Sequence, residues 1–229
     1  MRVRKRFLTA ADGAGVGGCG RKVTVSRTQP PVAAAPLNKN VPTDVAVAPR
    51  KTAGKKATFA MIWTIGHSTR AIEDFIALLD EYRIQTIVDV RSFPGSRKYP
   101  QFGKEALALT LAEHAIGYHW LGALGGRRRM LPDSPNTAWR NASFRGYADY
   151  MASPEFAQAL AHLQELANKT RTAIMCAEVL WWRCHRSMIA DALCVRGVKV
   201  MHILDATHEV PHPMTSPARI VDGKLSYTA

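Results

Sequence analysis

The feature that most constrains the fold is an alternation of short apolar runs with amphipathic segments across residues 57–229. Five apolar runs, rich in β-branched and aromatic residues, predict strands at 59–65, 85–90, 117–121, 172–176 and 198–204. Segments with helical periodicity between them predict helices at 69–82, 104–115, 145–151, 154–168 and 184–196.

This alternation is typical of α/β proteins. Strands that alternate with helices form a mainly parallel sheet, and strands that are apolar along their whole length are covered on both faces. We therefore predict a five-stranded, mainly parallel sheet with helices on both faces. A small C-terminal hairpin is predicted at 220–227, with Asp222 and Gly223 at its turn.

Most of the positive charge lies ahead of the predicted domain. Residues 1–58 contain 12 Lys or Arg and 2 Asp or Glu, and so carry +10 of the chain's net charge of +13. The segment has no regular periodicity, so we predict a disordered basic arm at 1–56 and a single α/β domain at 57–229. The arm is compatible with an electrostatic tether to nucleic acid, with a solvated tail, and with sequence translated upstream of the true start.

Composition argues against a membrane protein and against a disulfide scaffold. No apolar run is long enough to cross a bilayer, and four Cys in 229 residues do not suggest a disulfide framework. The basic start resembles a signal peptide, but residues 7–13 are too short and polar for its apolar core, while an organellar transit peptide stays open. A reducing, cytoplasmic setting with no membrane partner fits best.

Chemistry-bearing residues follow four of the predicted strands, at the point where each strand ends. The carboxyl ends of parallel strands meet at one edge of the sheet, and ligands bind at that edge in open α/β sheets. We therefore expect one shared rim. Its expected members are Gly66, His67, Ser68, Arg91, Gly125, Gly126, Cys176 and Glu178.

Several segments of the chain resemble an uncharacterised bacterial family known as domain of unknown function 488. They are TIGHST at 64–69, VDVRS at 88–92, LGG at 124–126, WRNASFRGYADYM at 139–151, and MCAE at 175–178 with RCHRS at 183–187. The resemblance covers about residues 60–228 and leaves the basic arm outside. It implies a Rossmann-like α/β fold and enzymatic activity, and it brings no established reaction.

Two thiols compete for a nucleophilic role. Cys176 ends a predicted strand before a helix, where backbone N–H groups, Arg183 and Arg186 would lower its pKa and hold an anion. That layout is similar to rhodanese-type sulfurtransferases and cysteine phosphatases, but this loop has no Gly for a tight anion cradle. Cys184 adjoins His185, although neighbouring residues on a helix do not face each other. Either thiol is equally compatible with a packing role.

Glu178 is the best candidate for proton transfer. Leu180, Trp181 and Trp182 follow it, and we expect desolvation among these apolar side chains to raise the pKa of its carboxyl group. The alternative role is an ion pair that fixes an Arg of the rim.

The sequence contains no fingerprint of a tightly bound cofactor. Four rim residues belong to types that bind metals, namely His67, Cys176, Cys184 and His185. No two of them have a usual zinc spacing, so the sequence predicts no metal site.

These residues favour an enzyme with an anion-binding pocket, whose substrate is a nucleotide, a nucleic acid or another phosphate-bearing molecule. Basic and aromatic residues mixed in the connections 93–102 and 127–145 support that substrate class. Two alternatives stay open: a non-catalytic nucleotide or nucleic-acid binding module, and rhodanese-like or phosphatase-like cysteine chemistry. The expected catalytic residues are Glu178, Cys176, Cys184 and His67, and the expected substrate-binding residues are Gly66, Ser68, Arg91, Arg183, His185 and Arg186.

Overall fold

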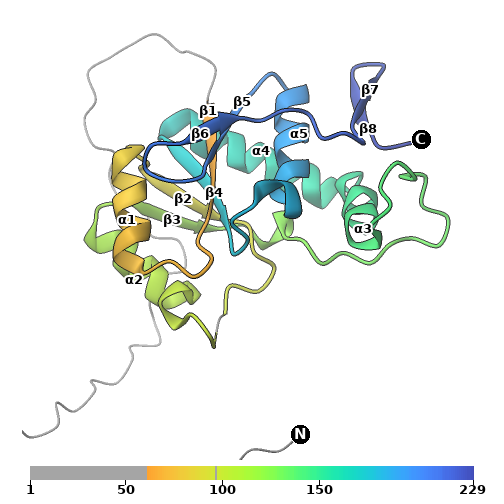
Figure 1. The fold of residues 1–229 in the computed structure, drawn as a ribbon. Helices are drawn as coiled ribbons and strands as arrows, with labels where there is room; N and C mark the ends of the chain where they lie inside the picture. Colours follow the sequence, from red (N-terminus) through yellow and green to blue (C-terminus); the bar gives the residue numbers. More distant parts are fainter. Residues whose placement is uncertain (1–60, 96) are drawn as a thin grey trace, which may run out of the picture. The chain divides into compact units, whose positions relative to one another are not determined.

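The structure is a computed structural model that describes residues 61–95 and 97–229, so the predicted arm at 1–56 lies outside the described residues. The described part contains a six-stranded sheet with the order β3-β2-β4-β1-β5-β6 (Figure 1). Its strands are β1 (Met61–Gly66), β2 (Thr86–Asp89), β3 (Gly117–Trp120), β4 (Thr172–Cys176), β5 (Lys199–Ile203) and β6 (Glu209–Pro211).

The five predicted strands are confirmed and pair in parallel, and the structure adds a sixth. Strand β6 pairs antiparallel with β5 at the edge of the sheet, so the prediction of five strands was one too few. The sequence did not reveal β6 because it has three residues, is largely exposed, and ends in Pro211. An edge strand tolerates a proline because one side of its backbone has no partner.

The predicted C-terminal hairpin is also confirmed. It consists of β7 (Arg219–Val221) and β8 (Lys224–Ser226), which pair antiparallel. Asp222 and Gly223 both have a positive φ, 48° and 73°, as a tight hairpin turn requires.

Helices cover both faces of the sheet, and each face has its own hydrophobic core (Figure 1). One core contains Phe75 and Leu107, and the other contains Leu160 and Leu193. The first face is covered by α1 (Ile72–Glu81) and α2 (Lys104–Glu113), and the second by α3 (Ala142–Met151), α4 (Pro154–Lys169) and α5 (Arg186–Val195). Three short 3₁₀ helices join these elements: η1 (Pro100–Phe102), η2 (Gly122–Leu124) and η3 (Trp181–Arg183).

Side-chain caps set where α3 and α4 begin. The side chain of Asn141 accepts hydrogen bonds from the backbone N–H groups of Ser143 and Phe144. Helix α3 therefore begins at Ala142, three residues before the predicted start. Ser153 caps α4 in the same way, ahead of Pro154, as predicted.

The strand order creates a crevice at the carboxyl end of β4. This strand lies between β1 and β2. The connections that leave β1 and β2 lead to α1 and α2 on one face, whereas the connection that leaves β4 leads to α5 on the other face. Neighbouring connections therefore diverge, which is the arrangement that opens a ligand crevice in α/β sheets.

In the described part of the chain, no helix is long and apolar enough to span a membrane.

Gly66 lets the connection after β4 pass directly over the end of β1. Gly66 is paired with Cys176 in the sheet, and a Cβ at position 66 would overlap the carbonyl oxygen of Glu178 and crowd the backbone of Val179. Only a residue without a side chain allows that approach.

We expect Gly66→Ala to lower the melting temperature by several degrees, because the backbone of Glu178 must move to admit the methyl group. Gly95→Ala is the matched control, since nothing lies within 4 Å of its Cβ position. Thermal unfolding followed by circular dichroism checks this, and equal melting temperatures for the two variants would contradict it.

Candidate functional site

A cavity of about 550 Å³ opens at the carboxyl ends of β1 and β4, and we name it the rim cavity. The structure brings six predicted site residues to its wall: Ser68, Cys176, Glu178, Arg183, Cys184 and His185. The remaining lining residues are Gly126, Arg127, Asn141, Ser143, Phe144, Tyr147 and Ala177.

The connection 127–145, which the sequence predicted to face the ligand, contributes Arg127, Asn141, Ser143 and Phe144 to the wall, although none of them was named as a site residue. The residues Asn141, Ser143, Phe144 and Tyr147 come from the start of α3, which lies far from β4 in the sequence. The motif at 139–151 was the available signal, because it includes all four of them. Periodicity does not show which end of a helix faces a neighbouring strand.

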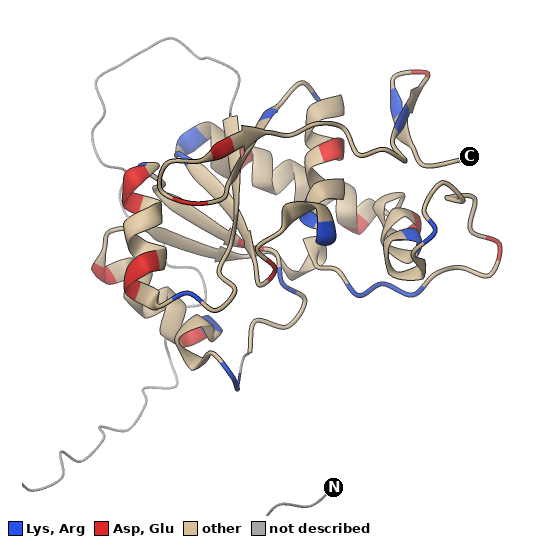
Figure 2. Ribbon diagram, in the orientation of Figure 1, with Lys and Arg blue, Asp and Glu red and all other residues tan. Residues whose placement is uncertain are grey.

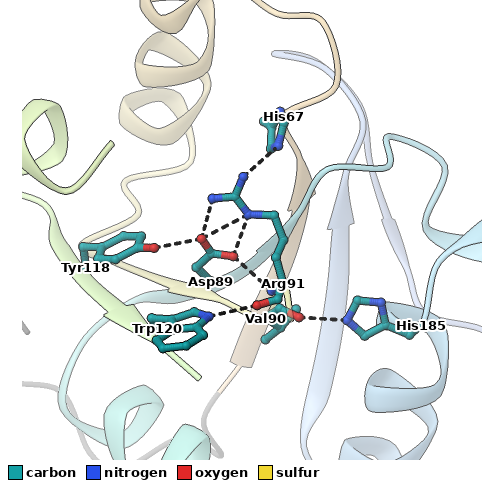
Figure 3. Close-up of polar contacts among 7 residues, drawn as sticks. All are labelled: His67, Asp89, Val90, Arg91, Tyr118, Trp120 and His185. Atoms are coloured by element: carbon teal, nitrogen blue, oxygen red, sulfur yellow. Dashed lines mark hydrogen bonds and ion pairs between the residues drawn. The ribbon is translucent and has the colours of Figure 1, made fainter. Parts of the chain in front are cut away.

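His67 and Arg91 do not line the cavity but belong to a buried network of polar contacts (Figure 3). The Arg91 guanidinium donates to both carboxylate oxygens of Asp89, from Nε at 2.9 and 3.1 Å and from its terminal nitrogen at 2.5 Å. Tyr118 donates to the same carboxylate at 2.8 Å. Asp89 therefore neutralises the charge of Arg91, whose predicted role in holding a substrate anion stays a prediction.

His67 is a neutral supporting residue in this network. Its Nδ1 donates to the carbonyl oxygen of Ser68 at 3.0 Å, so that Nε2 can accept from Arg91 at 3.3 Å. Its ring is stacked on Phe102, with 4.2 Å between the centroids. Burial and then the charge of Arg91 lower the pKa of His67 to about 4. The structure gives His67 a positioning role in this network, and its predicted role in catalysis stays a prediction. The buried Gly66 contributes through close backbone approach.

Arg186 is also buried, with 1% of its surface exposed, and it does not line the cavity. Its guanidinium donates to the backbone carbonyls of Glu178 and Val179, to Thr64 Oγ1 at 3.4 Å, and to Cys184 Sγ at 3.5 Å. In the structure the donors of Arg186 hold the connection between β4 and α5 in place, and its expected contact with substrate stays a prediction.

A chain of buried hydrogen bonds continues from Arg186 to Asp191. Thr64 Oγ1 lies 2.7 Å from His202 Nδ1, and His202 Nε2 lies 2.9 Å from His212 Nδ1. His212 Nε2 in turn lies 2.9 Å from the carboxylate of Asp191. Burial lowers the pKa of His202 to about 2, so this ring is neutral. A guanidinium has only donors, so Thr64 Oγ1 accepts from Arg186 while it also lies within hydrogen-bond distance of His202.

Cys184 and His185 face each other, which corrects the expectation from helical geometry. Cys184 has an extended backbone and His185 is the N-cap of α5, so both residues precede the regular helix. His185 Nε2 donates to the Val90 carbonyl at 3.0 Å, which leaves Nδ1 directed at Cys184 Sγ, 3.5 Å away (Figure 3). Gly126 provides the space, because a Cβ there would lie 3.0 Å from His185 Nδ1.

Cys184 is the more acidic of the two cavity thiols. The pKa of Cys184 is held well below its ordinary value by a hydrogen bond from the Cys176 thiol and by the nearby Arg186 and His185, which outweigh burial. The same hydrogen bond and burial raise the pKa of Cys176 well above its ordinary value. Sequence reasoning placed Cys176 first, because the hydrogen bonds to Cys184 depend on the three-dimensional structure.

Glu178 lines the mouth of the cavity with an exposed side chain. Its carboxylate accepts a hydrogen bond from the backbone N–H of Leu180 at 3.2 Å. The expected desolvation by Leu180, Trp181 and Trp182 is therefore wrong. Trp181 instead stacks on His202, with 4.1 Å between the centroids.

The cavity is strongly electropositive. The N-termini of α3 and α5 both border it, and Arg127 and Arg183 are exposed at its edge. Figure 2 shows basic residues at the start of α5 and along the connection between η2 and α3. Ser68 and Arg127 have φ values of 47° and 61°, a strained backbone conformation for residues other than Gly. Such strain is often found at functional sites.

Three side chains of the cavity are close enough to hold a metal ion together. The ligand atoms of Cys176, Cys184 and His185 all lie within 4.8 Å of one another. The spacing of these residues in the sequence did not indicate this group. They come together because the connection between β4 and α5 folds back on itself.

The low pKa of His67 predicts a specific pH dependence of stability. Its pKa is 6.5 ordinarily and about 4 in the folded chain, so the unfolded chain binds the proton first as the pH falls. The contribution of neutral His67 to the free energy of unfolding is complete above about pH 6.5, and it is lost as the pH falls toward 4. We expect His67→Gln to show a flatter decline in melting temperature between pH 6.5 and 4.5 than wild type. His208→Gln, at an exposed position, should keep the wild-type slope, and parallel curves for all three proteins would contradict this account.

Thiol reactivity tests the order of acidity. At pH about 7, in buffer with a chelator, iodoacetamide should modify Cys184 at least ~10-fold faster than Cys194, because the thiolate is the reactive form. Cys194 is the internal control, since burial raises its pKa. Peptide mass spectrometry over time gives both rates, and equal rates would show that Cys184 is an ordinary buried thiol.

Comparison with known proteins identifies the family but no reaction. Searches of the curated proteins and of the solved structures found no match. The family described as "Domain of unknown function DUF488" matches residues 71–193. This segment contains the start of α3 and the connection from Cys176 to His185, which together build most of the cavity. Because the match covers more than half of the chain, this protein belongs to the DUF488 family.

Proposed function

We propose that this protein is an enzyme that binds a phosphate-bearing substrate, preferably a nucleotide or the end of a nucleic acid, in the rim cavity. The observation that carries the proposal is the convergence of Arg127, Arg183 and the N-termini of α3 and α5 around one opening. The dipole of a helix favours an anion at its N-terminus, and Arg binds phosphate in a bidentate manner. At α3 the contribution comes from the dipole, because Asn141 already accepts from the N–H groups of Ser143 and Phe144.

The charge balance of the cavity supports an anionic ligand. Within residues 61–95 and 97–229, neither Arg127 nor Arg183 forms an ion pair with a carboxylate. Glu178 is the one carboxylate among the described lining residues. A phosphate group would therefore find two cationic side chains whose charges are not yet neutralised.

A second cavity beside the first supports a substrate with an aromatic base. It measures about 480 Å³, is lined by Phe93 and Trp120, and shares Gly126 and Arg127 with the rim cavity. Phe93 is 72% exposed, which is high for a large apolar side chain. Exposed aromatic rings next to Arg side chains bind bases by stacking.

Two lining residues favour an enzyme over a binding module. Cys184 is held by groups that favour its ionised form, and Glu178 places an exposed carboxylate at the mouth of the cavity. Binding of phosphate needs neither group.

The three Cys of the described residues are free thiols, which supports our inference of a reducing, cytoplasmic setting.

The first test of this proposal is binding of AMP by isothermal titration calorimetry. We expect Arg127→Gln and Arg183→Gln each to weaken binding by about tenfold, as expected for the loss of a charge-assisted hydrogen bond. Arg219→Gln is the matched control, because Arg219 is an exposed residue of the distant hairpin. If Arg127→Gln and Arg183→Gln bind AMP and inorganic pyrophosphate with the same affinity as the wild-type protein, the anion site is not in this cavity.

The second test separates an enzyme from a binding module. Phosphate or base release should be followed over a panel of nucleotides and of oligonucleotides with a terminal phosphate. We expect Glu178→Gln to abolish turnover with less than about threefold change in affinity, because the exposed carboxylate transfers protons without holding the anion. A protein that binds members of the panel but turns over none of them would instead be a binding module.

A further inference from the structure

We propose that Cys176, Cys184 and His185 bind one zinc ion in the wall of the rim cavity. Their three ligand atoms lie within 4.8 Å of one another, on a strand end and on the residues that precede α5. Two thiolates and one imidazole are ligands that zinc favours, and zinc sites with three protein ligands leave a fourth position for water or substrate.

The spacing of one pair of ligand atoms matches tetrahedral zinc. Zinc–sulfur and zinc–nitrogen bonds of about 2.3 and 2.0–2.1 Å place a sulfur and a nitrogen ligand about 3.5 Å apart at tetrahedral angles. Cys184 Sγ and His185 Nδ1 are 3.5 Å apart. The ion can therefore bind to this pair without rearrangement of either side chain.

The surroundings of His185 are those of a metal ligand. Its Nε2 donates to the Val90 carbonyl at 3.0 Å, which fixes the ring and leaves the lone pair of Nδ1 directed toward Cys184. Ligating histidines in metal sites donate their second N–H to a carbonyl or carboxylate in this way. Gly126 keeps the approach to Nδ1 clear of a side chain.

The surroundings of Cys184 also fit a ligating thiolate. Arg186 Nε donates to its sulfur at 3.5 Å, and Arg186 is itself fixed by Thr64 and by backbone carbonyls. A zinc ion with two thiolates carries no net charge, so the buried guanidinium does not repel the loaded centre. Hydrogen bonds to ligating atoms orient them and tune their basicity.

The fourth zinc position would open into the cavity that also contains Glu178, Arg127 and Arg183. If the proposed function is correct, the site makes the protein a hydrolase of its phosphate-bearing substrate. Zinc-bound water loses one proton to Glu178, and the resulting hydroxide oxygen bonds to the electrophilic atom of the substrate. The bond to the leaving group breaks, and Glu178 returns the proton to that group.

Metal binding can be measured without any substrate. The full chain, reduced and freed of metal with a chelator, is titrated with Co²⁺ or Zn²⁺ alone. We expect one ion per chain and, with Co²⁺, a thiolate-to-metal charge-transfer band. Bound Zn²⁺ should also raise the melting temperature and slow the alkylation of Cys184 at least ~10-fold, because binding to the folded state stabilises it and covers the thiolate.

Single variants assign the ligands. Cys176→Ser, Cys184→Ser and His185→Gln should each weaken Zn²⁺ binding by at least ~10-fold and reduce the charge-transfer band, since each removes one ligand. Cys194→Ser should bind as wild type does, because Cys194 lies apart from the group within α5. Circular dichroism of each metal-free variant confirms that it is folded, and a double Cys176→Ser, His185→Gln variant keeps the test decisive if one single variant unfolds.

Two results would overturn the zinc site: no ion bound at micromolar concentration, or binding that survives all three ligand substitutions. Fast alkylation of Cys184 that Zn²⁺ does not slow would also overturn it and would favour a thiolate nucleophile instead. These results leave the proposed function intact if AMP still binds the metal-free protein through Arg127 and Arg183. Loss of AMP binding with an intact zinc site would overturn the proposed function alone.

Discussion

The buried guanidinium of Arg186 is the interaction on which the rest of the site depends. Arg186 is 1% exposed, and an isolated buried charge is very costly unless its donors find acceptors. Here they reach the connection after β4, the hydroxyl of Thr64 in β1, and Cys184 Sγ. One side chain thus joins two neighbouring strands to the start of α5. Replacement of Arg186 would release all three elements together.

The fold follows from the sequence wherever periodicity and turn chemistry determine an element. The five parallel strands, the helices on both faces and the hairpin at Asp222 and Gly223 were all predictable from these signals. Strand β6 was not, because three exposed residues have no periodicity of their own and depend on the edge of β5 for pairing. The early start of α3 depends on the cap that Asn141 provides.

The site was predictable in position and less so in the roles of its residues. Strand ends identified the correct edge, because parallel topology brings Ser68, Cys176 and Glu178 together. Roles depend on burial and on partners that are distant in the sequence. Arg91 is neutralised by Asp89, and His67 is buried against Phe102. The burial of His67 has no signature in the local sequence, whereas Asp89 and Arg91 lie two residues apart in the VDVRS segment.

The hydrogen-bond chain from Asp191 to Arg186 was likewise not predictable from the sequence. Its members come from β1, β5, α5 and the segment after β6, so that no local motif contains them. The chain matters for the site because it contacts the hydroxyl of Thr64, which accepts from Arg186. The position of the Cys184 sulfur is thereby linked through Arg186 to groups from several elements.

The central claim is that one cavity holds both an anion and a zinc ion. A crystal structure of the full chain with Zn²⁺ and AMP, recorded at the zinc absorption edge, tests it most directly. The account predicts one anomalous peak between Cys176, Cys184 and His185, with the phosphate against Arg127 and Arg183. An anomalous peak on other ligands, or a phosphate bound outside this cavity, would contradict it.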